Sequence, residues 1–287
     1  MSLWLGNDFL QLLDLVRELA SGTRAYLVGG AIRDLLLGRP VKDLDFVQAH
    51  GSIPLARAVS RRLNGAVYTL DDVRHSARVI LRQGKKDEQV LDFTSFIGET
   101  LEQDLGQRDF TINAMALDLE KPEVLIDPLG GEADLEARQL RLCGPNSLIS
   151  DPIRVLRGVR LISSYDLRYG FEITEEMRVA IKKLGAVSGE RIRDELFKCL
   201  AVSNFDVAAG LMSEFGVYDQ LRLVTFGVDP SEPYSQKEDA ETLAMLTEAA
   251  DKPGGEKSQL EQTQNRELVH FHAYQTLLEE SLQGGRK

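Results

Sequence analysis

The sequence predicts an α+β fold, in which a head with a mixed β-sheet and flanking helices is followed by an all-α segment. Three observations predict this fold. A strand–turn–helix–strand pattern fills residues 25–47, a hairpin pattern fills residues 77–93, and from residue 173 onward the chain reads as helical. Taken alone, these elements fit an α/β or an α+β head, and they exclude a repeating βαβ wheel.

Composition indicates a soluble globular chain that is long enough for two domains. It has 287 residues, of which 43% are hydrophobic and 28% charged, and no apolar run approaches a membrane span. Charged residues interrupt the first twenty positions, so no signal peptide is expected. Cys143 and Cys199 have no metal or redox spacing, which suits a reduced cytoplasm. Because the net charge is −11, any contact with nucleic acid requires a local basic patch.

The chain begins with an amphipathic helix, predicted over residues 7–20, and continues into a buried strand over residues 25–28. Gly29 and Gly30 follow the strand and let the backbone turn tightly and come close to a ligand. The next helix offers its first N–H groups to an anion, and Arg33 in its first turn adds a guanidinium. A single glycine pair is ordinarily only a turn, so this pattern needs a second feature to indicate a site.

That second feature is a pair of aspartates in the next strand, predicted over residues 42–47. Asp43 and Asp45 lie two positions apart, so their side chains share one face of the strand. Carboxylate oxygens beside a phosphate-binding turn suit hard divalent cations. An isolated Asp-x-Asp is ordinarily a solvated strand end, but the combination within one strand–turn–helix–strand unit favours the functional interpretation.

A third carboxylate follows in the hairpin. After a helix over residues 54–63 and a strand over residues 66–70, the strands 77–81 and 89–93 are predicted to pair. Asp92 lies in the last of them and approaches Asp43 and Asp45 if the two strands are neighbours. The alternative is a polar residue at a strand edge.

Two further stretches follow, one with a polar cluster and one with a turn. In residues 101–119, apolar positions alternate with a dense cluster of polar side chains. The cluster consists of Arg108, Asp109, Thr111 and Asn113. Polar side chains among apolar ones indicate either a buried structural network or a functional site. Residues 125–135 read as a strand end followed by a turn rich in proline and glycine.

A helix predicted over residues 151–165 carries a ridge of three arginines, Arg154, Arg157 and Arg160. Ser150 or Asp151 is expected to cap this helix, with Pro152 at its first position. An unpaired ridge of positive charge is suited to an anion, so Arg157 and Arg160 would face phosphates.

Asp151 and Arg154 also suit the recognition of a base. A carboxylate only accepts hydrogen bonds and a guanidinium only donates them, which complements the amine and ring nitrogen of cytosine or adenine. Uracil and guanine present their hydrogen-bond donor and acceptor in the opposite order. They would leave buried polar groups unpaired, which costs about 1–3 kcal/mol for each group.

Four stretches, in order, resemble the signatures of the family of class II tRNA nucleotidyltransferases (CCA-adding enzymes) and bacterial poly(A) polymerases, within the polymerase-beta-type nucleotidyltransferase superfamily. They are LVGGAIRDLLLGRPVKDLDFV, RDFTINA, DPLGGEADL and SDPIR, starting at residues 27, 108, 127 and 150. The resemblance covers residues 25–220. Two positions depart from it: Gln107 stands where the family has arginine, which removes a positive charge near the phosphates, and Ser150 stands where it has glutamate.

The resemblance implies a template-independent enzyme that adds C and/or A from CTP or ATP to an RNA 3′ end, with tRNA as the expected substrate. Asp43 and Asp45 would hold two Mg²⁺ ions, and Asp92 would act as the general base on the attacking hydroxyl. A poly(A) polymerase that uses ATP only is the runner-up. The alternative from another class is a non-catalytic RNA- or nucleotide-binding module, which the two intact aspartates oppose and the short acidic C-terminus favours.

The resemblance also assigns nucleotide-binding positions and domains. Arg108 and Asp109 match positions that the family uses for the triphosphate and the ribose hydroxyls, and the third stretch is similar to a hinge in which Gly130 and Gly131 would supply flexibility. The full set of implied nucleotide-binding residues is Gly29, Gly30, Arg33, Arg108, Asp109, Asn113, Asp151, Arg154, Arg157 and Arg160.

The expected domains are a head (1–137), a helical neck that binds the base and RNA (138–220) and a short acidic, partly linker-like C-terminal region (221–287). Between residues 138 and 198 there are 12 basic and 8 acidic side chains, a local surplus that suits an RNA backbone and predicts binding that weakens with salt. The C-terminal region is shorter than the body and tail with which family members hold tRNA.

Overall fold

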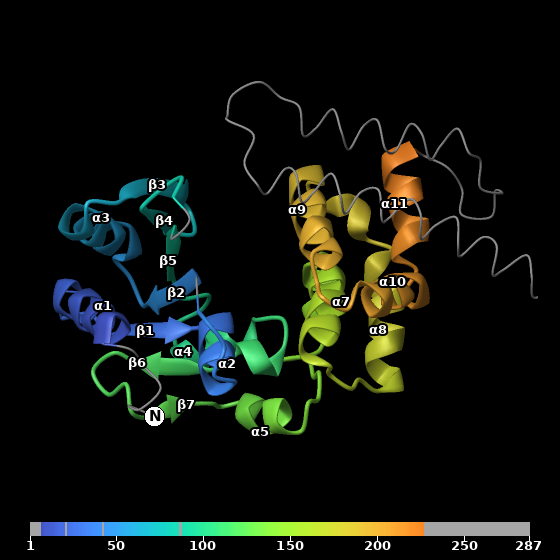
Figure 1. Ribbon diagram of the computed structural model, residues 1–287, viewed down its shortest axis with the longest axis horizontal. Helices are drawn as coiled ribbons and strands as arrows, with labels where there is room; N and C mark the ends of the chain where they lie inside the picture. Colours follow the sequence, from blue (N-terminus) through green and yellow to red (C-terminus); the bar gives the residue numbers. More distant parts are fainter. Residues whose placement is uncertain (1–6, 21, 42, 86–87, 227–287) are drawn as a thin grey trace, which may run out of the picture. The chain divides into compact units, whose positions relative to one another are not determined.

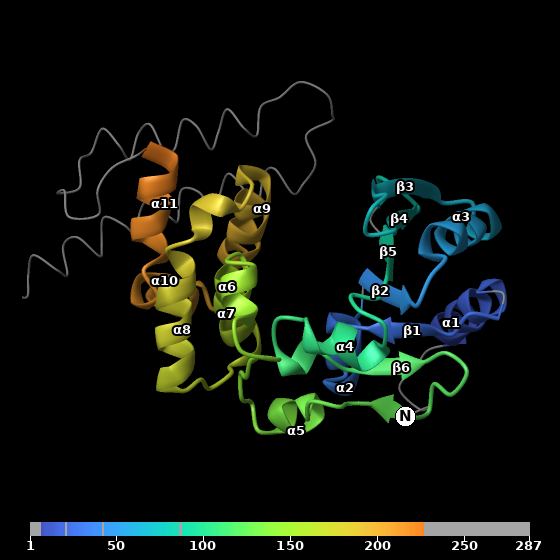
Figure 2. The ribbon, with the colours of Figure 1, turned by 180° about the vertical axis from the view of Figure 1, so that it is seen from behind.

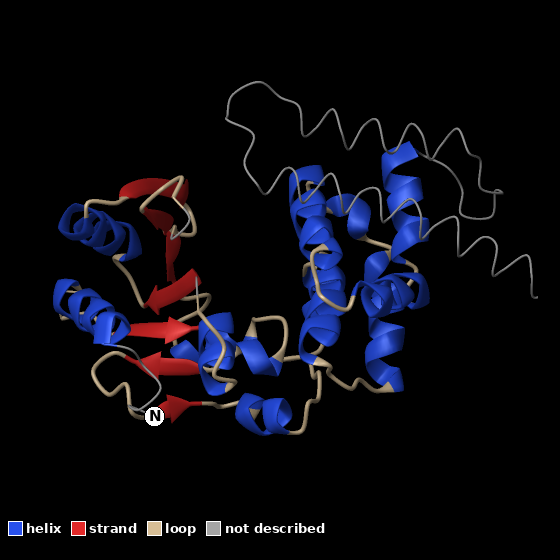
Figure 3. Cartoon of the chain, in the orientation of Figure 1, coloured by secondary structure: helices blue, strands red, loops and turns tan. Residues whose placement is uncertain are grey.

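The computed structural model describes residues 7–20, 22–41, 43–85 and 88–226. The chain divides into two compact units, residues 1–147 and residues 148–287. The first is α+β, and the elements described in the second are all helices, joined by turns and loops (Figure 3). Apart from residues 221–226, the predicted C-terminal region lies outside the described residues. In the part of the chain that the structure describes, no helix has the length and apolar character of a membrane span.

The described strands of the first unit form one seven-stranded sheet in the order β3-β4-β5-β2-β1-β6-β7 (Figure 1). They are β1 (Ala25–Val28), β2 (Asp43–Gln48), β3 (Ala66–Asp71), β4 (Ser76–Leu81), β5 (Gln89–Ser95), β6 (Ala116–Asp118) and β7 (Leu125–Ile126). Among these strands, β2 and β5 pair in parallel and the other neighbours pair antiparallel. This mixed sheet, with the predicted hairpin in place, confirms the α+β fold.

Helices flank this sheet. They are α1 (Asn7–Leu19), α2 (Gly30–Leu36), α3 (Ser52–Leu63), α4 (Leu101–Gly106), the 3-10 helix η1 (Thr111–Asn113) and α5 (Gly131–Glu136). Of these, α1, α2 and α3 lie where the sequence predicts helices, whereas α4, η1 and α5 were not predicted. α1 and α3 lie side by side, and α3 packs over β4 and β5 (Figures 1 and 2). The inward face of α3 consists of side chains at helical spacing, among them Leu55, Ala56 and Val59, which are at most 4% exposed.

The central strands place apolar side chains on one face and carboxylates on the other. Leu44 and Phe46 of β2 are buried, and Phe46 stacks on Phe93 of β5 with ring centroids 5.1 Å apart. Burying one such side chain contributes about 1.5–3 kcal/mol, so this packing fixes which face of each strand points inward. Because side chains alternate along a strand, Asp45 and Asp92 lie on the opposite face.

The described part of the second unit is a group of packed helices. α7 packs against α8, α9 and α10, and α11 packs against α10 and η2. The elements are α6 (Ser147–Ser150), which begins at the last residue of the first unit, α7 (Arg154–Tyr165), α8 (Phe171–Ile181), the 3-10 helix η2 (Leu184–Ala186), α9 (Gly189–Leu200), α10 (Phe205–Glu214) and α11 (Val217–Phe226).

The capping prediction for α7 is wrong. The helix begins at Arg154, its N-cap residue is Ile153, and no side chain caps it. Asp151 instead lies in the turn before the helix, where its backbone carbonyl accepts a hydrogen bond from the Arg154 N–H at 3.0 Å. Capping therefore does not account for the aspartate at this position.

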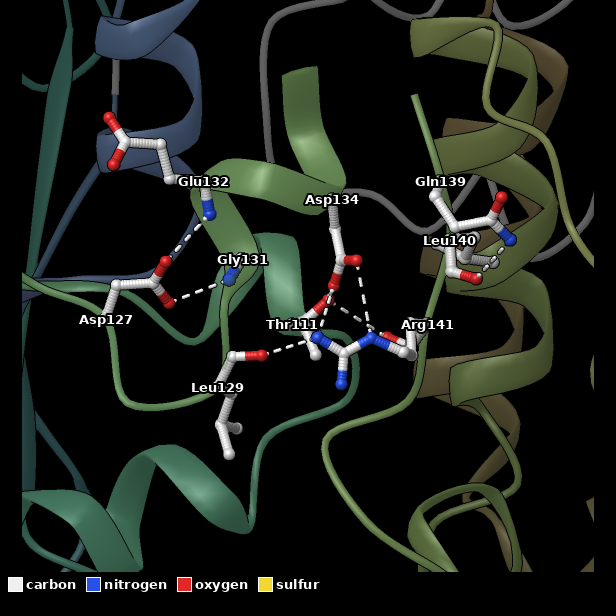
Figure 4. Close-up of polar contacts among 9 residues, drawn as sticks. All are labelled: Thr111, Asp127, Leu129, Gly131, Glu132, Asp134, Gln139, Leu140 and Arg141. Atoms are coloured by element: carbon white, nitrogen blue, oxygen red, sulfur yellow. Dashed lines mark hydrogen bonds and ion pairs between the residues drawn. The ribbon is translucent and has the colours of Figure 1, made fainter. Parts of the chain in front are cut away.

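Hydrogen bonds and an ion pair connect the stretch after β7 to the rest of the first unit (Figure 4). Asp127 accepts hydrogen bonds from the backbone N–H groups of Gly131 at 2.7 Å and Glu132 at 2.9 Å, which begins the unpredicted helix α5. Asp134 of α5 accepts from the Thr111 hydroxyl and pairs with Arg141 at 2.8 Å. These contacts also show why residues 138–147 group with the first unit, ten residues beyond the expected boundary.

Gly131 packs closely against the backbone of Thr111, and its role in flexibility stays a prediction. An alanine Cβ at this position would lie 2.2 Å from the Thr111 carbonyl oxygen, and relieving such a contact costs about 1–3 kcal/mol.

We expect Gly131→Ala to lower the midpoint of urea unfolding accordingly. The control is Gly106→Ala at the end of α4, where an added Cβ meets no atom within 4 Å. Equal stability of the two variants would contradict this account.

Candidate active site

Two strands bring three carboxylates to one face of the sheet. β2 and β5 lie in parallel register, with Asp45 opposite Asp92 and Asp43 opposite Val90. Asp43 and Asp45 share the face opposite the buried residues of β2, with Asp43 exposed and Asp45 half-buried. The structure therefore brings together the three aspartates that the sequence singled out from separate strands.

A guanidinium accompanies the third of these carboxylates. Arg78 lies on β4 directly opposite Asp92 and donates from Nε to Oδ1 and from Nη2 to Oδ2, each at 2.8 Å. The pKa of Arg78 is raised, first by these hydrogen bonds and then by the negative charges of Asp92, Asp43 and Asp45, while desolvation opposes the shift. One cationic side chain thus experiences the charge of all three carboxylates.

The glycine turn before α2 lies directly against Asp45. Gly29 has φ +80° and ψ −149°, and a Cβ added to it would lie 2.9 Å from Asp45 Oδ2 and 3.3 Å from Arg108 Nη1. Only glycine permits this backbone and this approach. Arg108 is oriented by Asp104, whose Oδ2 accepts hydrogen bonds from its Nε at 3.3 Å and its Nη2 at 3.0 Å. A carboxylate and a guanidinium therefore lie beside the glycine backbone.

The remaining predicted residues of the head form a buried polar network. Arg33 is 6% exposed and donates to Asn113 Oδ1, and Asn113 Nδ2 donates to Asp109 Oδ1 at 3.2 Å. Arg33 also pairs with Asp34 at 3.1 Å, and its Nη2 lies 3.1 Å from where a Cβ of Gly30 would be. Contact of Arg33 with a phosphate stays a prediction.

Asp43 and Asp45 suit the Mg²⁺ that the resemblance implies. Among the described residues, no three Asp, Glu, His or Cys side chains form a group that could hold a metal by themselves. Mg²⁺ does not require such a group, because it is usually held by one or two carboxylates together with waters and substrate phosphates. The shift at Arg78 shows that this face favours positive charge. Two carboxylates on β2, with Asp92 held by Arg78, therefore fit a divalent cation that a nucleotide helps to bind.

In the second unit, Asp151 and Arg154 lie together just before and at the start of α7. Arg154 Nε is 4.0 Å from Asp151 Oδ2, and Arg191 of α9 donates to that same oxygen at 2.8 Å. The predicted pair of acceptor and donor is thus in contact. Arg191, which sequence reasoning missed, holds the carboxylate of Asp151 toward α9.

The predicted arginine ridge is not uniformly unpaired. Arg160 donates from Nε to Glu195 Oε1 at 2.6 Å, and Lys198 lies 3.5 Å from the other oxygen of that carboxylate. Glu195 is 7% exposed, so this ion pair joins α7 to α9 inside the unit. One nitrogen of Arg160 is thus used inside the unit, and contact of Arg160 with phosphate stays a prediction. Contact of the half-buried Arg157 with phosphate stays a prediction.

The head and the helical unit each match the profile of a known protein family. The family profile described as Poly A polymerase head domain matches residues 25–141, and the profile described as Probable RNA and SrmB-binding site of polymerase A matches residues 170–223. The first match contains every head residue discussed above. The second match contains α8, η2, α9 and α10, together with most of α11.

Curated relatives match over part of their own length. A CC-adding tRNA nucleotidyltransferase of Geobacter sulfurreducens is 42% identical over 183 residues, which cover 62% of this chain and 41% of the relative. A Multifunctional CCA protein of Neisseria gonorrhoeae is 37% identical over 244 residues, which cover 79% of this chain and 58% of the relative. The chain therefore spans about half the length of these relatives.

Solved structures match over most of the chain. The Thermotoga maritima CCA-adding enzyme complexed with tRNA has a TM-score of 0.68 and 29% identity, and the match covers 89% of this chain and 61% of that one. A complex of a CCA-adding enzyme with CTP has the same TM-score and identity, with coverage of 88% and 61%.

Proposed function

The chain belongs to the family of class II tRNA nucleotidyltransferases and bacterial poly(A) polymerases, and from this premise we propose that it adds C, A or both, from CTP and ATP, to the 3′ end of tRNA without a template. The observation that carries the proposal is the convergence of Asp43, Asp45 and Asp92 beside the Gly29 turn. The names of the relatives, which are CC-adding and CCA-adding proteins, support it, as does the neighbour complexed with tRNA. A cytoplasmic location follows from such a substrate.

In this proposal the head residues bind and align the reacting groups. Asp43 and Asp45 would hold Mg²⁺, which when bound activates the terminal 3′-hydroxyl and stabilises the leaving pyrophosphate. The Gly29 backbone lets the triphosphate approach closely, and Arg108, held by Asp104, donates to its oxygens. Asp109 would accept hydrogen bonds from the ribose hydroxyls, and Asp92 would take the proton of the attacking hydroxyl.

We further propose that Asp151 and Arg154 read the base. Their contact at 4.0 Å places an acceptor beside a donor, the arrangement that complements the amine and ring nitrogen shared by cytosine and adenine. Asp151 is not used as a helix cap, which leaves its carboxylate available for this role apart from its bonds to Arg154 and Arg191.

Changing Asp151 to asparagine tests this assignment. The amide adds donors to a site built to accept, so we expect the preference for CTP and ATP over UTP and GTP to fall by about 10- to 100-fold. The measurement is kcat/KM with each of the four nucleotides. Asp206→Asn, an exposed residue in the first turn of α10, is the control for the same change of charge. Unaltered selectivity in the Asp151 variant would refute base reading by this residue.

A poly(A) polymerase is the second candidate, because the matching head profile carries that description. One experiment separates the candidates: tRNA lacking its 3′ end is incubated with the protein, Mg²⁺ and each labelled nucleotide in turn. For a tRNA nucleotidyltransferase we expect C to be added from CTP, A to be added from ATP, or A to be added from ATP only after C has been added. Long incorporation from ATP alone, regardless of the RNA end, would identify a poly(A) polymerase. No incorporation from any nucleotide would leave a binding module.

A further inference from the structure

The bond between Arg78 and Asp92 is not accounted for by the proposed reaction. Asp92 uses both of its oxygens to accept from one guanidinium, at 2.8 Å each. Such a two-bond pairing orients a carboxylate firmly and uses one lone pair on each of its oxygens. In this conformation Asp92 is therefore engaged with the protein itself.

The pair lies where it can be opened. The side chain of Arg78 is 42% exposed and that of Asp92 is 27% exposed, so water can solvate both groups when they separate. A fully buried pair would leave an uncompensated charge on breaking, at a cost of several kcal/mol, whereas a half-exposed pair opens at much lower cost.

The charges around Arg78 indicate what the pair does. Besides Asp92, the carboxylates of Asp43 and Asp45 also stabilise the positive charge of Arg78. Three carboxylates on one face repel one another, and Arg78 relieves that repulsion in the absence of a metal ion. A divalent cation on Asp43 and Asp45 would supply the same relief and would be repelled by the guanidinium.

We propose that Arg78 is the resident counter-ion of this carboxylate site and is exchanged for the divalent cation. The inference rests on the proposed function, because it takes Asp43 and Asp45 as the cation ligands. Arg78 offsets part of the negative charge of the three carboxylates and holds Asp92 while the cation is absent. When the cation binds, its charge replaces that of the guanidinium, and Asp92 is released to face the attacking hydroxyl. Arg78 is thus a positioning residue that acts through Asp92.

The test measures binding of Mn²⁺ alone, without nucleotide or RNA, from the electron paramagnetic resonance signal of free Mn²⁺. We expect Arg78→Gln to bind Mn²⁺ about tenfold more tightly than the unaltered protein, because a repelling charge is removed. The matched control is Arg74→Gln, which removes an equal charge from the same hairpin; Arg74 is 78% exposed and lies 4.0 Å from Asp71. Its Mn²⁺ affinity should stay within about twofold of the unaltered protein.

A second measurement separates this role from a merely structural one. In EDTA at low salt, Arg78→Gln should melt at a lower temperature than the unaltered protein, because Asp92 then loses both hydrogen bonds from Arg78 and one positive charge is removed from beside the three carboxylates. Saturating Mn²⁺ should close most of that gap. A purely structural contribution of Arg78 would lower the melting temperature equally in EDTA and in Mn²⁺, and that result would overturn the proposal.

Two further variants separate the proposed role of Arg78 from the proposed metal-binding role of Asp45. Arg78→Lys keeps a positive charge but loses the planar two-bond geometry, so its Mn²⁺ affinity should lie between those of the unaltered protein and Arg78→Gln. Asp45→Asn should weaken Mn²⁺ binding to the otherwise unaltered protein. If it does and Arg78→Gln leaves the affinity unchanged or lower, only the inference about Arg78 falls. If the unaltered protein has no Mn²⁺ binding that depends on Asp45, the proposed metal role falls as well.

Discussion

Replacing Asp45 by asparagine is expected to reduce nucleotide incorporation by about three orders of magnitude while the protein stays folded. Asparagine keeps the shape of the side chain beside Gly29 but removes the negative charge that would hold the cation. The loss of one such ligand removes several kcal/mol of transition-state stabilisation, and each 1.4 kcal/mol is about tenfold in rate. The measurement is incorporation from labelled CTP or ATP into tRNA that lacks its 3′ end.

The control for this prediction is Asp72→Asn, an exposed carboxylate in the turn between β3 and β4, which should leave incorporation within about twofold of the unaltered protein. The unfolding midpoint of Asp45→Asn should match that of the unaltered protein or exceed it, because one of three clustered negative charges is removed. Undiminished turnover by Asp45→Asn would refute the metal-binding role and, with it, the proposed mechanism.

Replacing Gly29 by alanine is expected to lower kcat/KM by about 100-fold or more. A Cβ at this position would lie 2.9 Å from Asp45 Oδ2 and 3.3 Å from Arg108 Nη1, so it displaces together the carboxylate and the guanidinium that we propose bind the metal ion and the phosphates. A displacement of about 1 Å in such a site is enough for a loss of this size. Steady-state kinetics with CTP and ATP measure the effect.

Gly22→Ala separates the backbone strain of this variant from the displacement of the site. Gly22 has φ +85°, close to the +80° of Gly29, but an added Cβ meets no atom within 4 Å there. Both variants should lose about 1–3 kcal/mol of stability from the strained backbone, and only Gly29→Ala should lose activity. Equal activity of the two variants would show that the glycine turn does not hold the substrate.

Much of the head could be predicted because its information is local. The apolar residues of α1 and α3 recur at helical spacing, and the alternation in β2 places Asp43 and Asp45 on one face whatever the rest of the chain does. The convergence of Asp92 with Asp45 is different. Asp45 and Asp92 are 47 residues apart in the sequence, and they meet only if β2 and β5 pair in one particular register. The sequence permits this register but does not dictate it.

The features that sequence reasoning missed are mostly partners brought together over a distance. Arg78 and Asp92 are 14 residues apart and meet through a strand register, and Arg191 and Asp151 are 40 apart and meet through helix packing. Asp104 was detectable, because it precedes Arg108 by four residues, the spacing of a helical ion pair. The pairing of Arg160 with Glu195 was missed for the same reason, since the two residues are 35 positions apart.

The parallel pairing of β2 with β5 makes this head unequally tolerant of insertions. The connection between them passes through α3, β3 and β4, and extra residues in the exposed turn at Gly84 only lengthen a loop, at little entropic cost. One extra residue inside β5 before Asp92 would instead rotate every later side chain to the other face, so that Asp92 would take the place of Phe93 opposite Phe46 and the stack of the two rings would be lost. Natural variation in length should therefore accumulate at the hairpin tip and be absent from the few residues before Asp92.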